Sequence, residues 1–225
     1  MLLHIEKVLD AAAVARMRTR LDAADWTDGR ETVGPQGAEV KRNLQLPEAS
    51  SLRVELGREV LAACARHPVF HAATLPVKIL PPRFNRYENG GAYGPHIDGA
   101  VMALADGSQL RSDIACTLFL ADPESYDGGE LIVEDTYGEH EIKLTAGDAI
   151  VYPASSLHRV EPVTRGVRVA AFFWIQSLVR DESQRRTLLQ LDTAIRELTA
   201  GAADPVAVKQ LTGVYHNLLR QWSET

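Results

Sequence analysis

Short apolar segments follow one another between Pro76 and Ser177, and turns that contain glycine separate them. The turns include Asn89-Gly90-Gly91, Asp127-Gly128-Gly129 and Ala146-Gly147-Asp148, which favour tight reversals of an extended chain. About eight strands without intervening helices predict a double-sheet jelly roll. The predicted strands are Val77–Leu80, Arg83–Tyr87, Asp113–Leu120, Glu130–Val133, Glu141–Leu144, Ala149–Tyr152, His158–Val163 and Val167–Ile175.

The segment before this β region combines helical and extended patterns. The capping serines Ser50 and Ser51 and the helix-terminating Pro68 mark the ends of one helix. We expect a strand at His4–Leu9, a helix at Ala11–Ala24, a loop at Thr27–Ala38, a strand at Val40–Leu46 and a helix from Ser50 or Ser51 to Arg66.

Two helices are expected after the β region. Apolar residues at helical spacing predict the first at Ser183–Leu198, and Asp204 with Pro205 begins the second. The fold class is therefore mostly β with flanking helices, with a jelly-roll core and a C-terminal helical pair. We divide the chain into an N-terminal support at 1–77, the jelly roll at 78–178 and a helical appendage at 179–225. The appendage is expected to pack on the core or to form a homodimer.

Charge and composition restrict the class of protein. The chain has 225 residues, which suffices for one domain with a sizeable core, and a formal net charge of −6. This charge gives no reason to expect nucleic acid or an anionic membrane as a partner. No signal peptide or apolar run of about 20 residues is visible. Cys64 and Cys116 form no CxxC pair and are expected to be reduced and buried, so we expect a cytoplasmic protein.

His96 and Asp98 are candidate metal ligands. They are two residues apart, so both side chains would leave one face of an extended strand that we expect to start at this motif. An imidazole and a carboxylate so placed provide two members of the 2-His-1-carboxylate triad that binds Fe(II). The pair alone is a weak motif, and chance pairing is the plain alternative. His158 follows a turn and an apolar strand, a context that the other histidines lack, so it is the expected third ligand.

Arg168 is the most discriminating residue of the pattern. It belongs to the predicted strand Val167–Ile175, and both faces of this strand are apolar. A buried guanidinium needs a partner, which is either a carboxylate of the protein or a ligand carboxylate held in bidentate fashion. Tyr87 and Tyr93 lie just before the metal motif, and a phenol there could hydrogen-bond a co-substrate. Thr117 and Leu131 are expected to form pocket wall.

These motifs resemble the iron- and 2-oxoglutarate-dependent dioxygenase superfamily, and within it the bacterial PKHD-type hydroxylases, which are related to prolyl 4-hydroxylases. The resemblance is carried by Phe84-Asn85-Arg86-Tyr87, Gly94-Pro95-His96-Ile97-Asp98, Tyr126-Asp127-Gly128-Gly129-Glu130-Leu131, Gly147-Asp148, Ser155-Ser156-Leu157-His158-Arg159-Val160, Arg165-Gly166-Val167-Arg168-Val169-Ala170 and Trp174-Ile175-Gln176-Ser177.

The resemblance implies a double-stranded β-helix that binds Fe(II) through His96, Asp98 and His158. It implies Arg168 as the anchor of 2-oxoglutarate. Some relatives add a second polar contact from a tyrosine on the strand that here reads Ile114–Phe119; this chain has Leu118 or Phe119 at that place, and Tyr87 is expected to supply the contact instead. The implied activity is a hydroxylation that consumes dioxygen and converts 2-oxoglutarate to succinate, with L-ascorbate as a further cofactor of such enzymes.

Two other functions remain open from the sequence. One is a cupin-like metalloprotein of non-oxygenase chemistry, and the other is a non-catalytic iron or 2-oxoglutarate sensor. The substrate is not identified by any motif. The loops Thr27–Ala38 and Ala100–Arg111 are expected to shape the entrance to the site.

Overall fold

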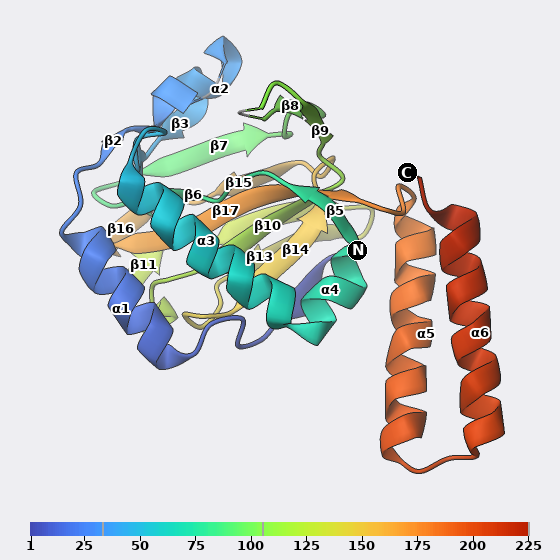
Figure 1. Ribbon diagram of the computed structural model, residues 1–225. Coiled ribbons are helices and arrows are strands. Elements are labelled where there is room, and N and C mark those ends of the chain that lie inside the picture. The colour runs from blue at the N-terminus through green and yellow to red at the C-terminus, as the bar shows by residue number, and fades with distance from the viewer. Residues whose placement is uncertain (33, 105, 225) are drawn as a thin grey trace.

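Two antiparallel sheets pack their inner faces on each other in the computed structural model, which describes residues 1–32, 34–104 and 106–224 (Figure 1). The larger sheet has eight strands. Seven of them follow one another in order, and the eighth, β5, pairs with β17 outside this order. In spatial order they are β1 (Leu3–Ile5), β14 (Ala149–Pro153), β10 (Ile114–Phe119), β17 (Arg168–Ser177), β6 (Arg83–Tyr87), β4 (Leu44–Gln45) and β2 (Thr27–Asp28), with β5 (Pro76–Ile79) at one end of β17.

The smaller sheet covers the inner face of the larger one. Its five strands are, in order, β13 (Gly138–Ile142), β12 (Leu131–Asp135), β15 (His158–Val160), β7 (Ala92–His96) and β3 (Lys41–Arg42). Two strand pairs stand apart, namely β8 (Val101–Ala103) with β9 (Gln109–Arg111), and β11 (Tyr126–Gly128) with β16 (Val163–Gly166). Leu131, Val133 and Val160 of the smaller sheet pack with Tyr87 and Trp174 of the larger sheet. The expected jelly roll is confirmed.

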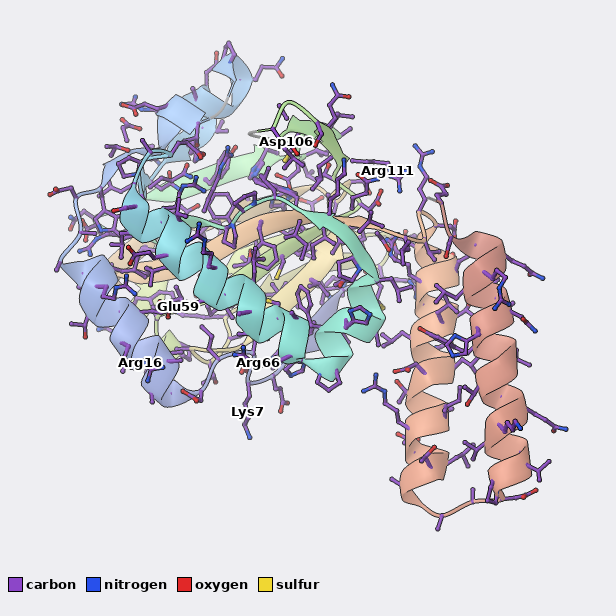
Figure 2. All side chains as sticks on the ribbon, viewed as in Figure 1. Lys7, Arg16, Glu59, Arg66, Asp106 and Arg111 are labelled. Atoms are coloured by element: carbon purple, nitrogen blue, oxygen red, sulfur yellow. The ribbon has the colours of Figure 1, made fainter. Side chains whose placement is uncertain are left out.

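Three helices cover the outer face of the larger sheet: α1 (Ala11–Asp22), α3 (Ser51–Arg66) and α4 (Pro68–Thr74). Ser50 caps α3 by accepting a hydrogen bond from the Arg53 amide. The polar faces of α1 and α3 point to solvent, as Arg16, Glu59 and Arg66 do in Figure 2. These helices therefore bury one apolar stripe each against the sheet.

Strand β17 separates the two cores. Val169, Ala171, Phe173 and Ile175 belong to the core beneath the helices, whereas Phe172 and Trp174 belong to the core between the sheets. This alternation confirms the prediction that the strand is covered on both faces. Arg168 shares the inner face, so its side chain enters the space between the sheets.

The C-terminal helices α5 (Glu182–Ala200) and α6 (Pro205–Trp222) form a hairpin that projects from the body of the protein (Figure 1). Its base is anchored by Leu188 and Val179 against Leu75. Arg111, which Figure 2 shows near this base, also forms an ion pair with Glu224 at 2.9 Å. The expected helical pair is confirmed. Among the described residues, every helix is too short or too polar to cross a bilayer.

The N-terminal segment differs most from the expectation. The strand expected at His4–Leu9 is only β1, and a turn at Lys7, which has a positive φ of 54°, follows it. The expected loop Thr27–Ala38 instead contains β2, the 3₁₀ turn η1 (Gly29–Thr32) and the start of α2 (Pro35–Val40). A further 3₁₀ turn, η2 (Pro123–Ser125), precedes β11. Proline is favoured in the first turn of a helix, which explains why Pro35 and Pro68 begin α2 and α4.

Cys64 and Cys116 are free and buried, as expected. Burial raises the pKa of the Cys64 thiol to about 12. A thiol that remains protonated is a poor nucleophile, so Cys64 acts as a small apolar residue of the core.

We predict that Phe173→Ala lowers the free energy of unfolding by about 3–5 kcal/mol, because Phe173 is fully buried beneath the helices beside Phe70. Phe172→Ala is the matched control, because the ring of Phe172 is only partly buried and faces the space between the sheets. Phe172→Ala should lower the free energy of unfolding by less than half of the loss caused by Phe173→Ala. Urea unfolding of the two variants measures both values, and equal losses would contradict this division of the cores.

Candidate metal centre and adjoining cavity

The two histidines meet because β7 and β15 are antiparallel neighbours. His158 lies directly opposite His96 in the register of this pair. Opposite residues of an antiparallel pair point to the same face of the sheet. Their imidazole ring centroids are accordingly 4.2 Å apart on the inner face. Sixty-two residues of sequence thus separate two rings that the sheet holds in contact.

Asp98 reaches these rings from outside the strand. β7 ends at His96, so the expectation that the His-x-Asp motif starts a strand is wrong. The carboxylate nevertheless lies 3.9 Å from His96 Nε2 and 3.8 Å from His158 Nε2. One ligand atom from each of the three residues lies within 4.8 Å of the other two. The structure therefore brings together all three predicted metal ligands.

Each histidine presents Nε2 to this space because its other nitrogen is engaged. His96 Nδ1 lies 2.8 Å from the Gly94 carbonyl oxygen, and His158 Nδ1 lies 3.0 Å from that of Ser156. Each Nδ1–H donates to its carbonyl, so the lone pair is on Nε2, as metal binding requires. Two imidazole nitrogens and a carboxylate, with the remaining positions free, fit Fe(II).

Burial changes the pKa of two of these three groups in opposite directions. Burial lowers the pKa of His96 to about 4, and the neighbouring His158 acts in the same direction. His96 is therefore neutral near pH 7. Burial also raises the pKa of Asp98, although the charge of the neighbouring His158 opposes this rise. A divalent cation beside Asp98 would offset the penalty of burying its negative charge.

A β-bulge lies next to the histidines. The register of β7 with β15 shifts between His96 and Tyr93. Gly94 and Pro95 of β7 therefore lie opposite the single residue Arg159 of β15. Pro95 occupies the bulge, where its missing N–H leaves no ladder bond unmade. The extra residue turns Tyr93 to the same face as His96, and the two rings stack at 3.6 Å. The bulge thus fixes the orientation of His96.

Arg168 begins β17 and lies opposite Tyr87 of β6. It is 1% exposed, and its guanidinium carbon lies 5.2 Å from the Tyr87 ring centroid and 5.3 Å from that of Phe119. Its Nε and Nη1 atoms have no hydrogen-bond partner among the described residues. No carboxylate in the described part of the chain forms an ion pair with it, so the alternative of an internal salt bridge finds no support. Buried donors without acceptors indicate a place for an anionic ligand.

Gly129 makes room for this arginine. A Cβ on Gly129 would lie 3.0 Å from Arg168 Cδ and 2.7 Å from a methyl carbon of Val163, and its φ of +69° is one that glycine adopts readily. The conformation of the Asp127-Gly128-Gly129 turn is therefore coupled to the position of the guanidinium.

One cavity of about 1280 Å³ connects these groups. All five predicted site residues line the cavity, namely His96, Asp98, His158, Arg168 and Tyr87. Thr117 and Leu131, which were expected to form pocket wall, line it as well. Burial raises the pKa of Tyr87, so its phenol keeps its proton and can donate a hydrogen bond. Residues of α2 and of the β8–β9 pair also line the cavity, as expected for the two entrance loops.

The N-terminal segment forms a polar wall of the cavity that was not predicted from the sequence. Lys41, Asn43 and Gln45 alternate with Val40, Arg42 and Leu44, and the polar set is buried whereas Val40 is exposed. Lys41 and Asn43 line the cavity. The alternation is visible in the sequence, but the usual rule predicts that the apolar residues of a strand are buried, which is the wrong face here. The expectation of one strand at Val40–Leu46 is also wrong, because the segment is divided into β3 and β4, which belong to different sheets.

Comparisons with known proteins agree with this geometry. The family model of the 2OG-Fe(II) oxygenase superfamily matches residues 82–176, and that of the PKHD-type hydroxylase C-terminal domain matches residues 182–224. The chain is 67% identical over 224 residues to a PKHD-type hydroxylase of Stenotrophomonas maltophilia strain R551-3, with 100% of both chains covered. It is 63% identical over 230 residues to one of Xylella fastidiosa strain M12, also with 100% of both covered.

Solved structures share the fold at low sequence identity. A prolyl-4-hydroxylase of Pseudomonas putida is 20% identical with a TM-score of 0.51, and the match covers 78% of this chain and 92% of that one. An oxidoreductase of the 2OG-Fe(II) oxygenase family from Burkholderia pseudomallei is 15% identical with a TM-score of 0.53, covering 78% and 84%. The chain therefore belongs to the PKHD-type hydroxylases of the 2OG-Fe(II) oxygenase superfamily, and it is an Fe(II)- and 2-oxoglutarate-dependent dioxygenase that hydroxylates a substrate.

Proposed function

We propose that His96, Asp98 and His158 hold the Fe(II) ion of this hydroxylase and that Arg168 binds the distal carboxylate of 2-oxoglutarate. The observation that carries the proposal is the convergence of two Nε2 atoms and one carboxylate within 4.8 Å. The unpartnered guanidinium of Arg168 in the same cavity supports the second half. A cupin-like metalloprotein of non-oxygenase chemistry does not require a buried arginine of this kind, whereas a 2-oxoglutarate sensor would share the arginine and lack the turnover.

The reaction divides its tasks among the residues of the cavity. Bound Fe(II), with 2-oxoglutarate and dioxygen, supplies the oxidising power that hydroxylates a C–H bond while 2-oxoglutarate becomes succinate and carbon dioxide. The two histidines and Asp98 would hold the ion, and a set of three protein ligands would leave positions for co-substrate and oxygen. Arg168 neutralises the distal carboxylate, and Tyr87 donates a further hydrogen bond beside it. Apolar walls such as Leu80, Leu131 and Phe172 exclude water.

We further propose that L-ascorbate supports the reaction by keeping the iron ferrous, and that the enzyme works in the cytoplasm without nucleic acid. The resemblance to related hydroxylases supports the role of ascorbate. Two buried, unpaired cysteines support a reducing compartment. The net charge of −6 disfavours binding to a polyanion.

Residues 78–178 carry the catalytic unit in this proposal, residues 1–77 support it, and residues 179–225 form a dimer contact. The helical hairpin projects beyond its anchor on the core (Figure 1). Its distal half exposes Leu198, Val206 and Val214, which are 39%, 64% and 48% exposed. Apolar residues of this size on an extended arm favour contact with a second copy of the chain.

We predict that His96→Ala lowers the affinity for Fe(II) by at least about 100-fold, more than the loss of an outer hydrogen-bond partner causes. His140→Ala is the matched control, because His140 lies on β13 and pairs with Asp135 at the surface. Iron content after anaerobic loading of each variant measures the effect. Equal iron binding by the two variants would remove His96 from the metal site.

We predict that Arg168→Ala weakens 2-oxoglutarate binding at least tenfold, because charge-assisted hydrogen bonds contribute about 1.5–3 kcal/mol each. Arg168→Lys should restore only part of the affinity, since lysine lacks the planar fork of donors. The visible charge-transfer band of the anaerobic Fe(II)–2-oxoglutarate complex measures the affinity. Arg58→Ala removes an exposed arginine on α3, away from the cavity, and it should leave the titration unchanged.

We predict that a chain ended after Ser177, or the full chain with Val206→Glu and Val214→Glu, has the mass of a monomer. The intact protein should have twice the mass of one chain, which is 24.7 kDa. Light scattering after size-exclusion chromatography measures both. The double variant separates the loss of a contact from the loss of folding, and an intact chain that is itself monomeric would refute the dimer.

A further inference from the structure

Lys41 is a buried lysine in the wall of the cavity. It begins β3 and lies opposite Tyr93 of β7, next to the proposed iron ligands along the sheet. The residue is 2% exposed and lines the cavity. Its Nζ atom lies 5.3 Å from the centroid of the Tyr93 ring, which stacks on His96. One aromatic ring therefore connects this ammonium group with the candidate metal centre.

The partners of Lys41 are neutral. Its Nζ donates to Thr32 Oγ1 at 3.0 Å and to Gln45 Oε1. The third N–H finds no acceptor among residues 1–32, 34–104 and 106–224, and no carboxylate there forms an ion pair with it. Burial, followed by the charge of Arg83, lowers the pKa of Lys41 to about 8. The carboxylates of Asp28 and Asp98 oppose this change without forming an ion pair with Lys41, and the group is still mostly protonated near pH 7. Lysine is rarely buried without a counter-charge.

Each of the other charged residues of the cavity wall has a partner in the protein or a proposed ligand. Arg83 is paired with Glu48, with 2.6 Å between Nε and Oε1. Asp98 faces the proposed metal, and Arg168 faces the proposed co-substrate. Within the described lining, Lys41 is then the remaining cation without a counter-charge. The adjoining Asn43 is 8% exposed and neither of its amide atoms has a hydrogen-bond partner.

We propose that Lys41 binds a carboxylate group of the substrate and thereby restricts this hydroxylase to organic acids. This inference rests on the proposed function, because it assigns Arg168 to 2-oxoglutarate. A lysine ammonium is a compact point charge, which suits a single carboxylate. Because only the Tyr93 ring separates Lys41 from His96, the hydroxylated carbon is a few bonds from that carboxylate. Neutral analogues are rejected because they leave the buried ammonium unpaired.

The test observes Lys41 directly by NMR. The full-length protein carries ¹³C at the lysine ε-carbons, with Zn(II) in place of Fe(II) and 2-oxoglutarate at saturation. Lys41→Met identifies the Lys41 signal by its loss, and Lys41→Arg does so if the methionine variant does not fold. Acetate, propionate and benzoate are then titrated against acetamide, propionamide and benzamide. Lys209→Met is the matched control, because Lys209 is exposed on α6.

We expect carboxylates to shift the Lys41 signal saturably, at least about tenfold more tightly than the amides of the same shape. The Lys209→Met protein should give the same titration. The inference is overturned if no carboxylate moves the signal, or if an amide binds as tightly as its acid.

A different result would reassign Lys41 to the co-substrate. If 2-oxoglutarate alone shifts the signal to saturation, and further acids have no effect, Lys41 is a co-substrate ligand and the inference is wrong. Failure of the proposed function is detected separately, by the absence of the charge-transfer band when the wild-type protein receives Fe(II) and 2-oxoglutarate. In that case the response of Lys41 to acids still reports on the anion site.

Discussion

The register between β7 and β15 is the constraint on which the site depends. It places His158 opposite His96 and thus converts a long separation in sequence into a contact between two rings. A shift by one residue would turn one histidine to the other face of the sheet, because side chains alternate along a strand. The bulge at Pro95 adds a second fixed element, since it turns Tyr93 onto His96. Backbone pairing between β7 and β15 therefore sets the geometry that metal binding requires.

Strand β17 links this geometry to the stability of the fold. One of its faces carries Phe173 in the core beneath α3 and α4, and the other carries Arg168 in the cavity. Because the two faces alternate residue by residue, the apolar core that holds the strand in place also fixes the position of the guanidinium. A rigid element with a packed outer face is a better support for a charged anchor than a loop, which samples several conformations. The burial of Phe173 is thus a condition for the placement of Arg168.

Much of this arrangement could be predicted from the sequence, and the exceptions have physical reasons. Glycine-containing turns and short apolar runs predicted the jelly roll, and the apolar neighbours of Arg168 predicted a buried guanidinium. The contact between His96 and His158 depends on strand pairing, which spacing along the chain does not encode. The premise of one extended strand for His96 and Asp98 was wrong, although the two side chains do meet. Lys41 was missed because its strand buries the polar side of an alternation whose apolar side is normally buried.

The unpaired polar groups of the cavity connect structure and selectivity. Arg168, Asn43, Asn85 and Trp174 all have buried atoms without hydrogen-bond partners, and all four line the cavity. A buried donor or acceptor without any partner costs about 1–3 kcal/mol, so a ligand that satisfies such a group is favoured. A ligand that matches these donors and acceptors recovers this free energy, whereas an apolar molecule of the same volume does not. A cavity with apolar walls and a few unsatisfied polar groups therefore discriminates by the position of charge in the ligand more than by its size.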